Sequence, residues 1–249
     1  PMKYAIFCLL AIVTPLLTSC IDGEEEVYIK ADGSAKVKAV YRVPGILFSA
    51  EDAEELKTNI TEGIEKQKNL QLIANRVDKE NGTRIITIEI ETDDMMALEG
   101  VLADHTRGVN SSKADKMLHA IMGTITVNLD GLKAGLQRDV DLGPLLDANL
   151  GKNSASILGD SEFRYIVHLP AAAETSNAHT VEDNGRTLKW AFKLRECRDK
   201  PISLNMVASI PLPWWVYAMV VLGLLVLAWA IFAFAKKWRA RRLQTAATA

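Results

Sequence analysis

The side chains that most often carry catalysis or bind metal ions are few in this sequence and stand far apart. Its histidines show no His-x-x-x-His or Glu-x-x-His spacing; they are His105, His119, His168 and His179. A zinc site needs three or four converging ligands, and no such pattern is present. The sequence also lacks a Gly-x-Ser-x-Gly elbow, a phosphate-binding glycine loop and a Ser-x-x-Lys pair. We therefore predict a protein that is not an enzyme and has no metal site and no cofactor.

Two carboxylate pairs and one thiol remain as candidates for chemistry. Asp93 with Asp94, and Asp139 with Asp141, could serve as an acid and a base. Turns and strand surfaces are the more usual places for such residues, and we assign them there. No base-bearing motif surrounds Cys197, so we interpret it as an inert thiol.

The N-terminus has the pattern of an export signal. The single cation Lys3 precedes an apolar run at residues 4–17, which is too short to span a bilayer comfortably. The run ends in Leu17-Thr18-Ser19-Cys20, which resembles the bacterial lipobox. That resemblance implies a signal peptide at residues 1–19 and lipidation of Cys20. The alternative is an uncleaved anchor or an ordinary signal peptide in which Cys20 has no role.

Residues 214–235 predict a transmembrane helix. The segment carries no charge, and a helix of this length covers about 33 Å, against about 30 Å of bilayer hydrocarbon. Trp214 and Trp215 stand where an interfacial aromatic belt would lie. The cations that follow predict a cytoplasmic tail at residues 236–249; they are Lys236, Lys237, Arg239, Arg241 and Arg242. We predict a protein of the bacterial cytoplasmic (inner) membrane whose domain, residues 20–210, lies outside the cytoplasm.

The charge of this exported region argues against nucleic-acid binding. All 31 Asp and Glu residues lie within residues 21–210, whereas six of the 29 Lys and Arg residues lie outside, which leaves a net charge of −8. An acidic surface repels a phosphate backbone. The sequence predicts a membrane as partner and names no protein partner.

Paired strands dominate the predicted domain. Short turn motifs separate strand-like segments and predict hairpins; they are Asp-Gly, Asn-Gly and Asp-Asn-Gly. The predicted pairs are 27–29 with 36–43, 70–78 with 83–91, and 178–182 with 186–194. Further strands are expected at 124–129, 162–169 and 202–210. Glycines interrupt residues 130–160, where we expect short strands and irregular segments.

Two helices complete the prediction. Ser49 and Asp52 have the spacing of a capping box, and apolar residues then recur every three or four positions. A second helix is expected at residues 114–122, after a polar loop at 103–113. The fold class is therefore α+β, with an antiparallel sheet of hairpins packed on one or two helices, plus a C-terminal transmembrane helix.

A resemblance at the C-terminal end of the domain adds a family. The segments His168-Leu-Pro170, Ser176-Asn177-Ala178 and Asn184-Gly-Arg-Thr-Leu-Lys-Trp190 resemble those of a family of bacterial envelope lipoproteins whose mycobacterial member is LppM. The layout is similar too, from lipobox to basic tail. The resemblance implies a curved sheet packed on helices, an apolar cavity and a role in binding envelope lipid.

Our main functional hypothesis is a module that binds lipid or another apolar ligand. Alternate residues of three strands would line a cavity of several hundred Å³; they are Val37, Ala39, Tyr41, Ile86, Ile88, Ile90, Leu188, Trp190 and Phe192. The alternative is a structural or accessory protein of an envelope complex, with no small ligand and an exposed apolar patch instead.

Overall fold

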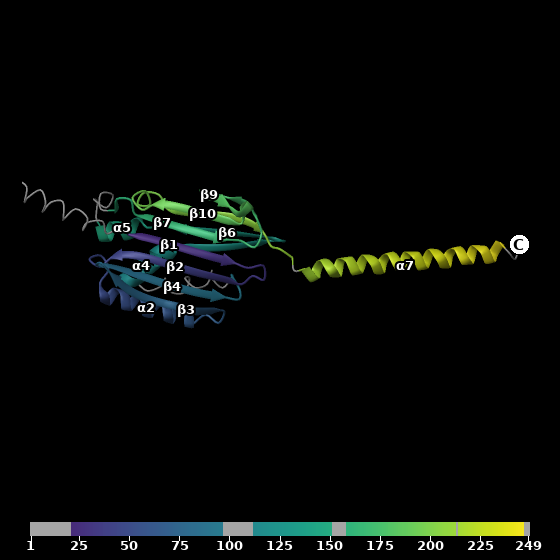
Figure 1. The fold of residues 1–249 in the computed structure, drawn as a ribbon, viewed down its shortest axis with the longest axis horizontal. Helices are drawn as coiled ribbons and strands as arrows, with labels where there is room; N and C mark the ends of the chain where they lie inside the picture. Colours follow the sequence, from purple (N-terminus) through teal and green to yellow (C-terminus); the bar gives the residue numbers. More distant parts are fainter. Residues whose placement is uncertain (1–20, 97–111, 151–157, 213, 247–249) are drawn as a thin grey trace, which may run out of the picture. The chain divides into compact units, whose positions relative to one another are not determined.

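The computed structural model describes most of the chain as two separate units (Figure 1). The described residues are 21–96, 112–150, 158–212 and 214–246. The first unit, a domain, ends at Ile210, and a helix follows in the second unit. The predicted signal peptide at 1–19, Cys20 and nearly all of the loop expected at 103–113 lie outside the described residues.

The elements of the domain follow the predicted order of two strands, helix, two strands and helix. Its first half consists of β1 (Asp22–Ile29), β2 (Ala35–Pro44), α2 (Ala50–Glu65), β3 (Leu70–Glu80), β4 (Thr83–Thr92) and α4 (Lys113–Met122). Its second half consists of β5 (Thr124–Asp130), β6 (Lys133–Val140), α5 (Gly143–Leu150), β7 (Glu162–His168), β8 (Ala173–Ser176), β9 (Thr180–Glu182), the 3-10 turn η4 (Asp183–Gly185), β10 (Thr187–Lys193) and β11 (Ile202–Ser209).

The strands form two sheets, and the α+β class is confirmed. One sheet has seven strands in the order β3-β4-β2-β1-β7-β10-β9, which Figure 1 shows from one edge to the other. The other has four strands in the order β5-β6-β11-β8. Pairings among the described strands are antiparallel except β1 with β7, which join the first strand of the domain in parallel to the strand that follows α5. The second sheet and this parallel pair were not predicted.

Local turn chemistry explains the hairpins. Asn81 and Gly82 both have positive φ, 47° and 80°, as a tight two-residue hairpin turn requires. Gly33 has φ 86° in the β1–β2 turn. The three predicted hairpins are confirmed by the antiparallel registers of β1 with β2, β3 with β4, and β9 with β10.

Both predicted helices are present, and the same device begins each of them. The Ser49 hydroxyl accepts a hydrogen bond from the Asp52 amide at 3.1 Å, and the Asp52 carboxylate accepts one from the Ser49 amide at 2.9 Å. Ser112 and Asp115 repeat this capping box at the start of α4. The buried face of α2 is the predicted stripe together with a glycine, and consists of Ala53, Leu56, Ile60, Gly63 and Ile64.

Residues 130–160 are more regular than predicted. β6 is an eight-residue strand, and α5 follows it. The prediction of short, irregular pieces was wrong for residues 133–150, because Gly135 and the polar residues of β6 hide its alternation. Arg138 and Val140 of β6 are buried, while Gln137 and Asp139, which alternate with them, are exposed.

One hydrophobic core unites both sheets with the helices. Its buried members come from nine of the described helices and strands and include Tyr41 of β2, Ile60 of α2, Ile88 of β4, Met117 of α4, Val140 of β6, Tyr165 of β7 and Leu204 of β11. Because the second sheet contributes to the same core, the apolar faces of the predicted hairpins are covered by strands as well as by α2 and α4.

Gly123, which links α4 to β5, is expected to tolerate no side chain. Its φ of 63° and ψ of −154° belong to glycine almost alone. A Cβ there would lie 2.2 Å from the Asp139 carbonyl oxygen. We expect Gly123→Ala to lower the free energy of unfolding by more than about 2 kcal/mol, because steric clash adds to backbone strain.

The matched control is Gly33→Ala in the β1–β2 turn. Gly33 also has positive φ, 86°, but a Cβ there meets nothing within 4 Å. Gly33→Ala should therefore lower the free energy of unfolding only by the backbone strain, about 1–2 kcal/mol. Urea unfolding of both variants measures the difference, and equal losses would contradict the proposed clash at Gly123.

The second unit is the helix α7, Trp214–Ala246, which continues past the predicted end at residue 235. Within the described residues it holds the only helical window, Trp215–Phe232, that is long and apolar enough to cross a membrane, with a mean hydropathy of 2.4. None of that window is buried. Trp215 is exposed. The other side chains assigned to the membrane boundary lie outside the described part; they are those of Trp214, Lys236, Lys237, Arg239, Arg241 and Arg242.

Candidate functional site

An apolar cavity of about 130 Å³ lies inside the domain. Strands of both sheets line it, and α2 and α4 contribute as well. The central strands β1 and β2 place Val27 and Ala39 in its wall, and β6 of the other sheet places Leu136 there. The cavity therefore lies where the two sheets and the two helices meet in the core.

The structure brings most of the predicted lining residues to this cavity. The lining includes Val37, Ala39, Tyr41, Ile88, Ile90 and Trp190. Ile86 and Leu188 are fully buried in the surrounding core and do not line it. Phe192 is half-buried and packs edge-on against Tyr165, with ring centroids 6.3 Å apart.

Sequence reasoning missed the half of the wall that the second sheet and the helices supply. These residues are Ile60, Ile64, Leu118, Met122, Ile125, Val127, Leu136, Leu204 and Met206. The apolar stripe of α2 was predicted to pack on the sheet, and Ile60 and Ile64 are indeed buried in the core, but their place in the cavity wall was not predicted. No signal in the sequence showed that β5, β6 and β11 form a separate sheet facing it.

The predicted volume of several hundred Å³ was too large. Side chains of the second sheet occupy much of the space that a single curved sheet would leave open, and about 130 Å³ remains. Pockets for drug-sized ligands usually measure about 300–1,000 Å³, whereas an apolar cavity of about 150 Å³ holds benzene. This cavity in its present shape can therefore hold part of an acyl chain but no complete lipid.

A buried ion pair forms part of the cavity wall. Glu25 of β1 and Arg138 of β6 are 4% and 7% exposed. The guanidinium donates to both carboxylate oxygens of Glu25, at 3.1 Å for the Nη2–Oε1 bond. The Tyr41 hydroxyl donates to Oε1 of Glu25 at 2.6 Å. The pair connects the two sheets and leaves no net charge at the cavity.

Arg138 also binds the C-terminal turn of α4. Its Nε and Nη2 donate to the carbonyl oxygens of Met122 and Ile121, both at 3.0 Å. The guanidinium carbon lies 4.9 Å from the ring centroid of Tyr165. Burial acts to lower the pKa of Arg138, but the carboxylate of Glu25 outweighs it and raises the pKa, so Arg138 remains a cation.

Tyr165 is the unsatisfied polar residue of the cavity wall. Its hydroxyl is buried and has no hydrogen-bond partner within the described part of the chain. Burial raises the pKa of Tyr165, which keeps the hydroxyl protonated. A buried hydroxyl without a partner costs free energy, so its presence here suggests that it can serve a polar atom of a bound molecule.

The two cavity tyrosines are expected to respond differently to loss of the hydroxyl. Tyr41→Phe should cost about 1.5–3 kcal/mol of stability, because it removes a hydrogen bond to the Glu25 carboxylate. Tyr165→Phe should leave stability unchanged or raise it by up to about 1 kcal/mol, because it removes an unpaired buried group. Chemical denaturation measures both, and a large loss for Tyr165→Phe would show that the hydroxyl has a partner in the protein.

A second, smaller cavity adjoins the first. It measures about 60 Å³ and is lined by apolar residues near the start of β1, among them Ile21, Phe48 and Leu142. Tyr41 lines both cavities. A change in the Tyr41 side chain would therefore be needed for one ligand to occupy both spaces.

The residues first considered for chemistry lie apart from this cavity. His168 binds Glu26 at 2.9 Å and stacks on Tyr28, and the Nδ1 of His179 accepts the Ala191 amide at 3.0 Å. His119 is exposed, and His105 lies outside the described residues. Within the described ranges, no group of three or more His, Cys, Asp or Glu side chains is placed to hold a metal ion.

The carboxylate pairs and the thiol serve local structure. The Asp94 carboxylate accepts the Met96 amide at 3.0 Å, Asp139 accepts the Gln137 amide group at 2.8 Å, and Asp141 accepts the Gly143 amide at 3.0 Å. Asp93 is exposed. Cys197 is buried, and burial raises the pKa of its thiol to about 11.

Comparison with known proteins gives a structural likeness. No protein-family model matches the chain, and no curated protein matches it. The folded domain of the Mycobacterium tuberculosis LppM protein, solved by NMR, superposes with a TM-score of 0.48 at 12% sequence identity, covering 78% of this chain and 91% of that one. Membership of the LppM-like family remains a prediction, and the function proposed below rests on the cavity and on α7.

Proposed function

We propose that this chain is a membrane-anchored lipoprotein of the bacterial envelope whose domain binds an apolar ligand, the acyl part of an envelope lipid, without catalysis. The observation that carries the proposal is the cavity between the sheets. Its wall is made of aliphatic side chains such as Ile88, Leu136 and Val167. An apolar void of this kind excludes water and binds apolar groups readily.

The polar residues of the cavity wall set which part of a ligand fits. Glu25 and Arg138 neutralise each other and bind their neighbours fully, so they present no free charge to a headgroup. The Tyr165 hydroxyl offers a single hydrogen bond. This arrangement suits an acyl chain with an ester or carboxyl oxygen near its end, and it gives an anionic headgroup no counter-charge.

The anchors supply the location. α7 is apolar over Trp215–Phe232, which supports a membrane span. The cations after residue 235 favour a cytoplasmic tail, and lipidation at Cys20 would add a second anchor. A domain held in this way lies at the outer face of the cytoplasmic membrane, next to a supply of lipid.

Native mass spectrometry of the detergent-extracted full chain tests the proposal. The wild-type protein should carry a co-purifying lipid or fatty acid in addition to its covalent modification. Ala39→Leu should lose that adduct, because Ala39 lines the cavity and a leucine there fills it.

The matched control is Ala191→Leu, which makes the same change at an exposed position of β10. It should keep the adduct. Thermal unfolding without ligand should show that Ala39→Leu is no less stable than the wild type, as expected when a void is filled. An adduct absent from the wild type, or retained by Ala39→Leu at the wild-type level, would contradict the proposal and favour a protein-interaction role.

A further inference from the structure

The turn between β5 and β6 exposes two leucines at the end of a hairpin. Asp130 pairs with Lys133, so Gly131 and Leu132 form a two-residue turn, with Gly131 at φ 59°. Leu129 is 58% exposed and Leu132 is 53% exposed. The turn requires glycine at its first position, but nothing in its geometry requires leucine at the second.

Hairpin turns normally carry Asn, Asp, Ser or Gly, which are polar or small and fit the backbone angles of a tight turn. Two large apolar side chains within four residues of one turn therefore form a small exposed apolar tip. Within the described residues, neither leucine belongs to the buried core. More than half of each leucine side chain remains in contact with water, so the tip can gain free energy from an apolar partner outside the domain.

The position of the tip in the chain indicates what that contact is. The Ile210 amide donates to the Leu132 carbonyl at 2.7 Å, so the last residue of the domain is bonded to the turn itself. Only residues 211–213 separate Ile210 from the start of α7 at Trp214. Four chain steps span at most about 14 Å, so the length of the chain itself limits how far Trp214 can be from Ile210.

We propose that the β5–β6 tip, Leu129 and Leu132, inserts into the outer interface of the membrane that α7 spans. The proposal rests on the membrane span of the proposed function and is independent of the cavity. The interaction is apolar rather than electrostatic, since Lys133 beside the tip is bound to Glu174 at 2.5 Å and has no free charge for a headgroup. The partner is a lipid surface of any headgroup charge.

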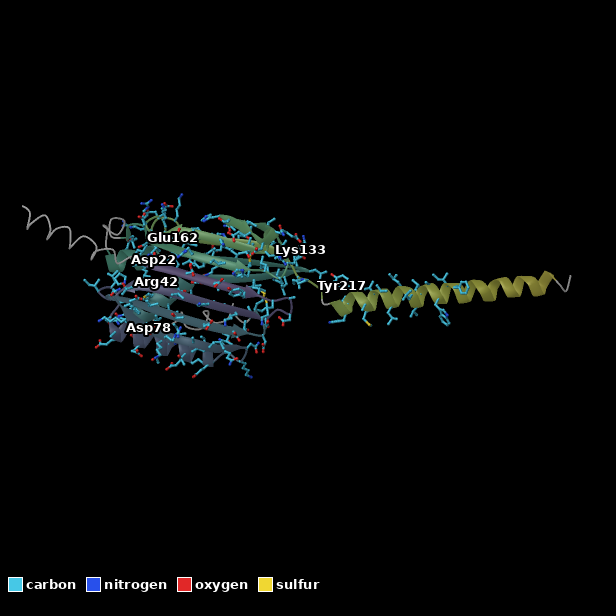
Figure 2. All side chains as sticks on the ribbon, in the orientation of Figure 1. Asp22, Arg42, Asp78, Lys133, Glu162 and Tyr217 are labelled. Carbon is cyan, nitrogen blue, oxygen red and sulfur yellow. The ribbon has the colours of Figure 1, made fainter. Side chains whose placement is uncertain are left out.

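Docking at this tip fixes which end of the domain meets the membrane. β6 runs from Lys133 to Val140, about 23 Å at the usual rise per residue. Ile21 lies beyond its far end, beside Leu142 in the second cavity. Figure 2 likewise shows Lys133 at the end of the domain opposite Asp22. A lipid on Cys20 would hold that opposite end, so the two anchors would act at opposite ends of the domain.

Fluorescence quenching in vesicles tests the docking. A single cysteine is introduced into the full chain by Leu132→Cys and labelled with an environment-sensitive maleimide dye. The native cysteines should not react, because Cys8 would leave with the predicted signal peptide, Cys20 would be acylated, and Cys197 is buried with a raised pKa. The control is Ile73→Cys on β3, the outer edge strand of the seven-stranded sheet, where Ile73 is 42% exposed. Vesicles of neutral phosphatidylcholine carry a spin-labelled acyl chain as quencher.

We expect the dye at position 132 to be quenched at least twofold more strongly than the dye at position 73. Equal quenching at both positions, or none at 132, in chains that float with the vesicles would overturn the docking while leaving the membrane span intact. Failure of the labelled chains to float with the vesicles would refute the span itself, and the docking with it. Added anionic lipid should leave the ratio unchanged, and a ratio that appears only with anionic lipid would overturn the apolar mechanism.

Discussion

Arg138→Met is expected to lower the free energy of unfolding by about 3–5 kcal/mol. The substitution leaves the Glu25 carboxylate buried without its cation, and it removes the donors to the carbonyl oxygens of Ile121 and Met122. The variant therefore lacks the side-chain bonds by which Arg138 connects the two sheets to each other and to α4. Urea unfolding monitored by tryptophan fluorescence measures the loss.

Two further variants distinguish the cost of an unpaired buried charge from the cost of losing an ion pair at the surface. Arg164→Met breaks an exposed pair with Glu24, whose closest N–O distance is 3.3 Å, and should cost no more than about 1 kcal/mol. The double variant Glu25→Leu with Arg138→Met removes both buried charges and should be more stable than Arg138→Met alone. A double variant that is less stable than the single one would show that the cost lies in packing rather than in the unpaired charge.

Two arginines in the centre of α7, Val221→Arg with Leu225→Arg, are expected to abolish the membrane span. Each arginine at the centre of a membrane helix costs about 2.5–3.5 kcal/mol, and both positions lie in the apolar window. The cationic tail should then remain outside the cytoplasm. Protease added to spheroplasts should cleave the tail of this variant and leave the wild-type tail intact.

Membrane association alone would not distinguish the variant from the wild type, because a lipid at Cys20 would keep both proteins on the membrane. Accessibility of the tail to protease does distinguish them. The control exchanges apolar residues at the same positions, Val221→Leu with Leu225→Val, and should protect the tail as the wild type does. Cleavage of the wild-type tail by external protease would reverse the predicted topology.

The hairpins and helix starts could be predicted because their causes are local. Asn81-Gly82 needs only its own two residues to adopt positive φ, and Ser49 with Asp52 closes a capping box within one turn of chain. The inward faces of β2 and β4 followed from alternation alone. These elements gave the fold class and six of the residues around the cavity.

The second sheet could not be predicted because distant pairings form it. β11 lies between β6 and β8, and the parallel pair β1–β7 joins residues about 140 positions apart. Local pattern carries no information on which of many strands will meet. The cavity volume was overestimated for the same reason.

The buried ion pair was missed although a signal existed. Glu25 lies in a run of three glutamates, which is typical of a solvated surface, yet it alternates with Gly23 and Val27 on the inward face of β1. Arg138 alternates in the same way with Leu136 and Val140. One acidic and one basic residue, each among small or apolar residues on the inward face of its strand, could have been recognised as partners.

Methyl NMR of the full chain in lipid nanodiscs tests the central claim, an acyl chain inside the cavity, most directly. With Ile, Leu and Val methyl groups labelled and the acyl chains of the lipid protonated, we predict intermolecular NOEs from acyl methylenes to Ile88, Ile90 and Leu136, which line the cavity. NOEs confined to α7 and to the exposed Leu129 and Leu132 would show a domain that touches the membrane but holds no lipid, and would contradict the account.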